Sequence, residues 1–218
     1  MFRFRIKFAK NEVLRFIGHL DLFRCWERAF RRAKLPLEYS QGFNPRPRLN
    51  LASALPLGIT SQGEILDTWL SKQIPVMEIK KALDKGLPPG IQIIEVTEVD
   101  LGLPSLQSQV TSAEFMAKLL AYVPDLDERI QNLMSAQSVP RQRRGKPYDL
   151  RPLIDNLSWL EKRDETEQCL FMRLLARESA TGRPEEVLSA LNIPPEMARI
   201  SRTKLILSTG DTFRQGDN

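Results

Sequence analysis

The chain has 218 residues, of which 42% are hydrophobic and 27% charged, with a formal net charge of +5. This is the make-up of a soluble protein of one large domain or two small ones. The longest apolar run is too short for a membrane span, and the alternating, charged residues 1–8 lack the apolar stretch of a signal peptide, so we expect a cytoplasmic protein without membrane contact.

The first predicted elements are a strand and a helix. Residues 2–8 alternate between apolar and basic side chains, which predicts a half-buried strand with a basic outer edge or face. A helix is expected from residue 18 or 19 to residue 34, where Leu35-Pro36 ends it. At 100° per residue, its two sides differ in character. The apolar arc holds Leu22, Phe23, Trp26, Ala29, Phe30 and Ala33, and the basic side holds Arg24, Arg28, Arg31, Arg32 and Lys34.

The positive charge is concentrated at the start of the chain. The first fifty residues carry twelve Lys or Arg against four Asp or Glu, a net charge of +8, whereas the other 168 carry twenty against twenty-three, or −3. A one-sided basic surface on a near-neutral protein favours a polyanionic partner, most often nucleic acid. The basic helix side would contact phosphates, which position a nucleic acid without reading its sequence. The alternative is a solvated helix face.

The loop at residues 41–48 is the most specific segment. Its two prolines make it stiff and prevent it from pairing as a central strand. Its arginines suit phosphates, its aromatic residues suit stacking on bases, and its amides suit hydrogen bonds to base edges. The alternative is a rigid edge loop with incidental charge. The candidate contacts in and beside the loop are Tyr39, Gln41, Phe43, Asn44, Arg46 and Arg48.

The remaining elements predict an α+β fold with two ferredoxin-like halves. Strands at 49–55, 64–71 and 91–99 and a helix at 75–85 complete a β-α-β-β-α-β order in the first half. The second half is predicted to repeat this order, with strands within 115–122, 139–160, 168–176 and 203–207 and helices within 124–136 and 184–191. We therefore predict a basic first half at 1–102, a second half at 103–210 and a polar tail at 211–218.

Two further features, His19 and a second basic run, each have a structural and a functional interpretation. His19, near Asp21 at the helix start, is the only histidine and is a candidate general base for metal-free RNA cleavage. Its helical angle places it on the apolar arc, however, which favours a structural role. A second basic run, with Arg141, Arg143 and Arg144, reads as a flexible loop that is either solvated or able to clamp nucleic acid.

Several kinds of chemistry lack their usual residues. Cys25 and Cys169 lie far apart and form no metal-binding cluster, so no metal or cofactor is expected. There is no phosphate-binding loop motif, no G-x-G-x-x-G and no G-x-S-x-G. The residues thus favour a binding role over catalysis.

Three stretches, at 16–22, 31–37 and 39–48, resemble a bacterial family of unknown function associated with radical SAM proteins, and the resemblance continues through 55–58 and 63–67. It implies an accessory module, fused to or encoded with a radical SAM protein, that supports maturation or modification of RNA or the ribosome. In that family the loop typically reads Asn-Pro-His-Pro, whereas Arg46 stands here at the third position, which favours phosphate contact over a metal or acid–base role.

The layout is also similar to the repeat-processing endoribonucleases of CRISPR systems, which have duplicated ferredoxin-like halves. Their Gly-rich C-terminal loop has no good match in residues 208–211. Our leading hypothesis is an RNA-binding accessory protein. The alternatives are a metal-independent endoribonuclease that uses His19, and a protein-docking module for a radical SAM enzyme.

Overall fold

The chain divides into two structural units. The computed structural model describes residues 1–161, 167–177, 180–209 and 213; its first unit comprises residues 1–110 and 205–218, and its second comprises residues 111–204. The described residues form five α helices and mostly antiparallel strands, so the predicted mixture of helices and sheet is confirmed. The two ferredoxin-like halves and their boundaries stay predictions. Except for Phe213, the predicted tail at 211–218 lies outside the described residues.

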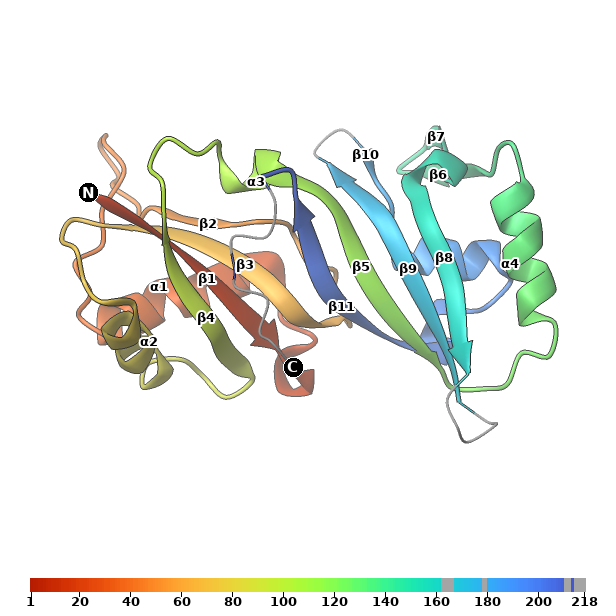
Figure 1. Ribbon diagram of the computed structural model, residues 1–218, viewed down its shortest axis with the longest axis horizontal. Coiled ribbons are helices and arrows are strands. Elements are labelled where there is room, and N and C mark those ends of the chain that lie inside the picture. The colour runs from red at the N-terminus through yellow and green to blue at the C-terminus, as the bar shows by residue number, and fades with distance from the viewer. Residues whose placement is uncertain (162–166, 178–179, 210–212, 214–218) are drawn as a thin grey trace. The chain divides into compact units, whose positions relative to one another are not determined.

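The first unit is built around its first strand, β1. This strand pairs antiparallel with β3 on one side and with β4 on the other, and β2 pairs with the far edge of β3. The strand order is β2-β3-β1-β4 (Figure 1). Along the chain the elements are β1 (Phe2–Lys10), α1 (His19–Arg32), β2 (Leu49–Leu51), β3 (Thr60–Leu70), α2 (Val76–Asp84), β4 (Ile91–Val99) and α3 (Leu106–Gln109), with a 3-10 turn at Glu12–Leu14.

The core of this unit lies between the sheet and the two long helices. Phe4, Ile6 and Phe8, which alternate along β1, are buried against α1 and α2. Helix α1 contributes Trp26, whose ring meets that of Phe8 edge-on with 4.8 Å between centroids. The apolar arc predicted for α1 is therefore the face that the sheet covers, and this fixes its basic side toward solvent.

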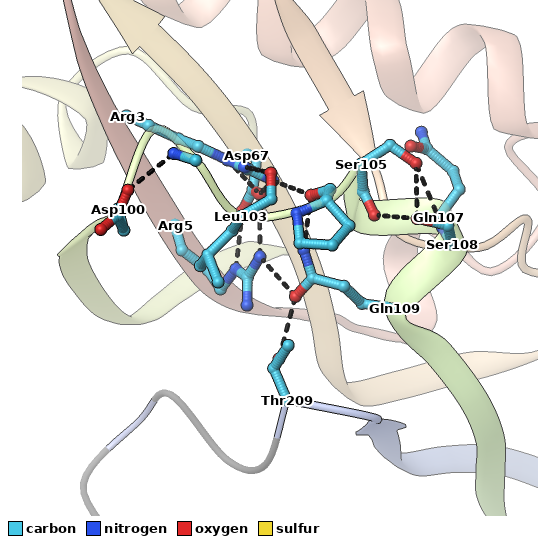
Figure 2. A network of polar contacts seen from close by, with 12 residues as sticks. Arg3, Arg5, Asp67, Asp100, Leu103, Ser105, Gln107, Ser108, Gln109 and Thr209 are labelled. Atoms are coloured by element: carbon cyan, nitrogen blue, oxygen red, sulfur yellow. Dashed lines mark hydrogen bonds and ion pairs between the residues drawn. The ribbon is translucent and has the colours of Figure 1, made fainter.

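The opposite face of β1 is also buried, which corrects the predicted basic outer face. Arg3 and Arg5 are only 2% and 0% exposed. Both converge on Asp67 of β3, whose carboxylate oxygens lie 2.7 Å from Arg3 Nη2 and 2.8 Å from Arg5 Nε (Figure 2). The prediction was wrong because a period of two shows that a strand has two faces but does not show which other segments cover them.

The segment after β4 covers this face and accepts further hydrogen bonds from both arginines. Arg3 donates to the backbone oxygens of residues 103 and 104, at 2.7 and 2.9 Å, and Arg5 donates to Gln109 Oε1 at 3.2 Å. Thr209, from the end of the chain, donates to the same Gln109 oxygen at 3.0 Å (Figure 2). The buried Arg–Asp network, by which we mean Arg3, Arg5, Asp67 and Gln109, thus ties distant parts of the unit together.

Gly90 lies where two turns approach closely. It has a φ of +97°, and a Cβ built on it would lie 2.8 Å from Leu14 Cγ. We expect Gly90→Ala to lower the free energy of unfolding by about 1–3 kcal/mol, because it adds a clash to a strained backbone. Gly42, which has a φ of +126° and where an added Cβ would meet no atom within 4 Å, is the matched control for strain alone. Urea titration that gave both Ala variants the same stability would contradict the clash.

The second unit is built around β9. This strand pairs antiparallel with β5 on one side, and with β8 and the short β10 on the other. Strand β11 neighbours β5 (Figure 1). The elements are β5 (Val110–Leu119), α4 (Leu126–Ser135), β6 (Pro140–Arg143), β7 (Lys146–Asp149), β8 (Ile154–Glu161), β9 (Gln168–Arg177), β10 (Ala180–Thr181), α5 (Pro184–Ala190) and β11 (Ala198–Leu207), with 3-10 turns at Arg151–Leu153 and Pro195–Met197.

The second basic run is a β-hairpin, which corrects the predicted flexible loop. Strands β6 and β7 pair antiparallel, with Arg141 opposite Tyr148 and Arg143 opposite Lys146. The two turn residues, Arg144 and Gly145, have φ values of 49° and 77°. Positive φ at both central residues is characteristic of the tight turn whose twist matches that of a hairpin. The glycine at the second position makes this turn accessible at low cost.

Candidate nucleic-acid interface

The five cations predicted on the solvent side of α1 are all exposed. This basic face consists of Arg24, Arg28, Arg31 and Arg32, which lie opposite the buried arc of the helix, and of Lys34, which follows the helix end at Arg32, two residues earlier than predicted, with a φ of 53°. Two of its arginines form surface ion pairs within the helix, Arg24 with Asp21 at 3.1 Å and Arg31 with Glu27 at 3.4 Å. Against these two carboxylates the five cations leave a net charge of +3 on one solvent-facing surface.

The cations of the basic face have different local roles. Arg32 donates to the backbone oxygen of Gly86 and so links α1 to the end of α2. Arg31 and Arg32 lie in the last turn of α1, where positive charge is favourable beside the free carbonyl groups. Arg28 takes part in no ion pair within the described ranges and lies between Arg24 and Arg31 on the helix surface. Arg28 is therefore the central cation of this face that is most available to an external anion.

The loop predicted to be stiff is closed by hydrogen bonds across its base. Tyr39 pairs with Pro47 as an isolated bridge, and Ser40 N donates to the Arg46 oxygen at 2.8 Å. Arg46 N in turn donates to Ser40 Oγ at 3.0 Å. Phe43, at the tip, is fully exposed. An aromatic ring that is held out on a closed loop is accessible for stacking on a partner.

The other candidates of the loop differ in accessibility. Gln41, Asn44 and Arg46 are exposed, and Tyr39 is nearly half exposed. Arg48 is half-buried: its guanidinium lies 4.8 Å from the centre of the Trp69 ring and also contacts Met1 Sδ. Arg48 thus holds the base of the loop against β3, whereas the tip residues face solvent.

His19 is exposed, so the prediction that it shares the buried arc of Trp26 is wrong. It is the first residue of α1 and precedes Leu22, the first residue of the helix that the sheet covers. Helical angle alone does not show where along a helix the covering sheet begins. His19 is accordingly placed where solvent and an external molecule reach it.

Cys25 lies on α1 between the buried arc and the basic face. Its pKa is raised by burial, an effect that the nearby charge of Arg28 opposes and that of Asp21 reinforces. A raised pKa keeps the thiol protonated at neutral pH, and the thiolate is the nucleophilic form. The geometry therefore offers no activated cysteine beside the basic face.

The cations of the β6–β7 hairpin belong to the second unit, whereas the basic face and the loop belong to the first. Arg141 and Arg143 are half-buried and Arg144 is exposed at the turn. Arg143 places its guanidinium 5.1 Å from the centre of the Tyr148 ring and donates to the Thr181 oxygen at 3.4 Å. The cations of the hairpin are therefore a feature of the second unit and are not counted with the basic face of α1.

An exposed apolar cluster was not expected from the sequence. Val13, Phe16, Leu20 and Leu57 are each more than 60% exposed. The Arg15 guanidinium lies 4.7 Å from the Phe16 ring centre, and Gly58 N donates to the Arg15 oxygen, which brings the two segments side by side. In the sequence, Val13, Phe16 and Leu20 are spaced by three and four residues, as on one face of a helix, and this spacing does not show that the side chains stay exposed.

Two kinds of structural feature are absent from the described ranges. No three His, Cys, Asp or Glu side chains there are grouped so that they could hold a metal ion. No helix there is both long and apolar enough to cross a membrane.

Comparison with known proteins places the chain by sequence. The model of a protein family described as "Uncharacterized protein conserved in bacteria (DUF2344)" matches residues 3–184. That match includes the basic face, the loop and the hairpin. Among curated proteins, none matches the chain.

Proposed function

The chain belongs to the bacterial family DUF2344, and on that premise we propose that it is an RNA-binding accessory protein. The observation that carries the proposal is the basic face of α1, whose five exposed cations precede a closed loop with a fully exposed aromatic tip. Figure 1 shows the chain passing from the end of α1 to this loop at one end of the first unit. A single-stranded nucleic acid needs both features, since it presents phosphates and unstacked bases together.

Each part of the surface has its own task in this proposal. Arg24, Arg28 and Arg31 bind phosphates and position the strand. Phe43 and Tyr39 stack on unpaired bases, which tolerates any sequence because every base has a flat face. Asn44 and Gln41 donate to and accept from base edges. The two ferredoxin-like halves are part of this proposal, and the first half presents helix and loop on a rigid sheet.

Phe43→Ala tests the stacking role. We expect the affinity for single-stranded RNA to fall by about 1–3 kcal/mol, the usual contribution of one stacked base. The unfolding free energy should stay within about 0.5 kcal/mol of the wild type, because the ring contacts nothing in the folded protein. Fluorescence anisotropy with a labelled oligonucleotide measures the first and urea titration the second. Equal affinity of the variant and the wild type would remove Phe43 from the interface.

A protein-docking module is the second candidate, and the exposed apolar cluster favours it. Large exposed apolar groups beside one another are typical of protein interaction sites. In this version a radical SAM protein covers Val13, Phe16, Leu20 and Leu57. Phe16→Ser with Leu57→Ser would then abolish co-purification of that partner from native cells and leave RNA affinity unchanged. Continued co-purification of the partner with this variant would reject the cluster as its docking surface.

The alternative that the protein is a ribonuclease using His19 gives a different expectation from the binding role. His19→Ala would keep RNA affinity but stop cleavage, and the wild type would leave cyclic-phosphate ends. Incubating the wild type with RNA in the presence of a metal chelator, and analysing the ends of the products, decides this question. Uncleaved RNA would remove this alternative and leave the binding role.

A further inference from the structure

A cavity of about 410 Å³ lies beside the β6–β7 hairpin in the second unit. Its walls come from the hairpin, from Leu153 after it and from β10. A cavity of this size is within the range that holds small organic ligands. It is independent of the basic face of α1, which belongs to the first unit.

Three cations line the cavity within four residues of chain. Arg143 and Lys146 are directly opposite each other across the hairpin, and Arg144 lies at the turn between them. Like charges that face each other across two strands destabilise the pairing. Neither Arg144 nor Lys146 forms an ion pair within the described part of the chain. An anion in the cavity would relieve this repulsion.

The acidic groups near the cavity offset these cations only in part, and one of them is Glu186, whose charge acts on Tyr148 of the lining. Asp149 lines the cavity, but its Oδ1 accepts the backbone N–H groups of Val139, at 2.7 Å, and Arg151, at 3.0 Å. These two hydrogen bonds lower the pKa of Asp149 and keep it charged, although burial acts in the opposite direction. The cavity lining described by the structure therefore carries three positive charges against one negative charge that the backbone already engages.

Other parts of the lining suit a flat, partly apolar group. Pro147, Leu153 and Tyr148 supply apolar and aromatic surface. Arg143 Nε is buried and makes no hydrogen bond within the described residues, whereas Tyr148 Oη, also buried, lies beside the Arg143 guanidinium and the Glu186 carboxylate. Burial raises the pKa of Tyr148, and the charge of Glu186 raises it further, so the phenol stays a protonated donor. A buried guanidinium N–H group without a partner, beside a cationic cavity, favours a polar ligand.

We propose that this cavity binds a nucleotide. The phosphate would contact Arg143, Arg144 and Lys146, because guanidinium groups and ammonium groups are the usual phosphate ligands of proteins. The base would lie against Tyr148 and Pro147, with the phenol available as a hydrogen-bond donor. The nucleotide is either free or an unpaired residue of an RNA strand, and both sources offer the same phosphate and ring.

The proposal is tested by isothermal titration of the full-length protein with AMP, inorganic phosphate and adenosine in turn. We expect saturable binding of one AMP, weaker binding of phosphate and no measurable binding of adenosine. Arg144→Asn with Lys146→Gln should weaken AMP binding by about 10²-fold, since each of the two lost charged contacts is worth about tenfold. Asn tolerates the positive φ at the turn, so this double variant keeps the hairpin.

A matched control removes the same charge elsewhere in the second unit. Lys118 and Arg199 are exposed on β5 and β11, and their double replacement by Gln should leave AMP affinity unchanged. Tyr148→Phe, which removes only the hydroxyl, should weaken binding less than the charge variant. Absence of AMP binding at millimolar concentration, or equal losses in the charge variant and in the control, would overturn the proposal.

Competition identifies the source of the nucleotide. Displacement of AMP by a short single-stranded RNA, retained when Arg24, Arg28 and Arg31 are neutralised, would show that the cavity takes a nucleotide of a strand. AMP binding that RNA does not displace would support a free nucleotide. The competition is repeated with the variant in which the basic face of α1 is neutralised. AMP binding to the cavity is therefore measured separately from RNA binding to α1, and the loss of one does not imply the loss of the other.

Discussion

Replacing Asp67 with Asn is expected to lower the free energy of unfolding by about 3–5 kcal/mol. Asp67 is fully buried and is the carboxylate on which both Arg3 and Arg5 converge. Asn keeps the volume but removes the charge, and it turns an amide N–H₂ group toward guanidinium donors. Two buried cations then lose their counter-ion, and uncompensated buried charge is among the most destabilising changes known.

The size of this effect is measured by urea unfolding followed by tryptophan fluorescence. Asp84→Asn is the matched control, since Asp84 forms a surface ion pair with Lys80 at 3.5 Å in the same unit. Surface pairs contribute at most about 1 kcal/mol. Arg3→Met should cost less than Asp67→Asn, because Asp67 then keeps its contacts with Arg5. A loss below about 1 kcal/mol for Asp67→Asn would contradict the structural role of the buried Arg–Asp network.

Neutralising the basic face of α1 is expected to weaken RNA binding on the order of 10²-fold at 0.1 M salt. The variant replaces Arg24, Arg28 and Arg31 with Gln. Binding to phosphates releases counter-ions, so the dependence of log affinity on log salt should become shallower by about 2, or about 0.7 for each lost contact with a single strand. The fold should persist, because these side chains are exposed and two of them are held by weak surface pairs.

The control for this variant carries the same loss of charge on the second unit. Lys118, Arg177 and Arg199 are exposed there, and Lys118 is ion-paired with Glu167 as Arg24 is with Asp21. Fluorescence anisotropy over a series of salt concentrations compares the two triple variants with the wild type. Parallel salt slopes for all three proteins would mean that α1 makes no phosphate contacts.

Local patterns predicted most of the secondary structure. The strand expected at 91–99 has those bounds in β4, and the helix expected from residue 18 or 19 begins at His19. These elements follow from periodicity and from Pro and Gly at their ends, which are properties of neighbouring residues. Periodicity also predicted which side of α1 is exposed, because a helix that buries one arc must turn the other outward.

Contacts between distant segments could not be predicted. The burial of Arg3 and Arg5 depends on Asp67 and on residues 103–109, which lie 62 to 104 positions away in the chain. Likewise, the turn at Arg144 and Gly145 was not recognised as a hairpin because both flanking strands are polar and short. The exposed apolar cluster also depends on two segments that meet only in the folded unit.

The central claim is that RNA lies along the basic face of α1 and the loop that follows. Ultraviolet crosslinking of the full-length protein to a single-stranded RNA, with mass-spectrometric mapping of the crosslinked peptides, tests it most directly. We expect crosslinks within residues 24–48, including Phe43, and their loss when Arg24, Arg28 and Arg31 are replaced by Gln. Crosslinks confined to other parts of the chain, or none at all under conditions where RNA binds, would contradict it.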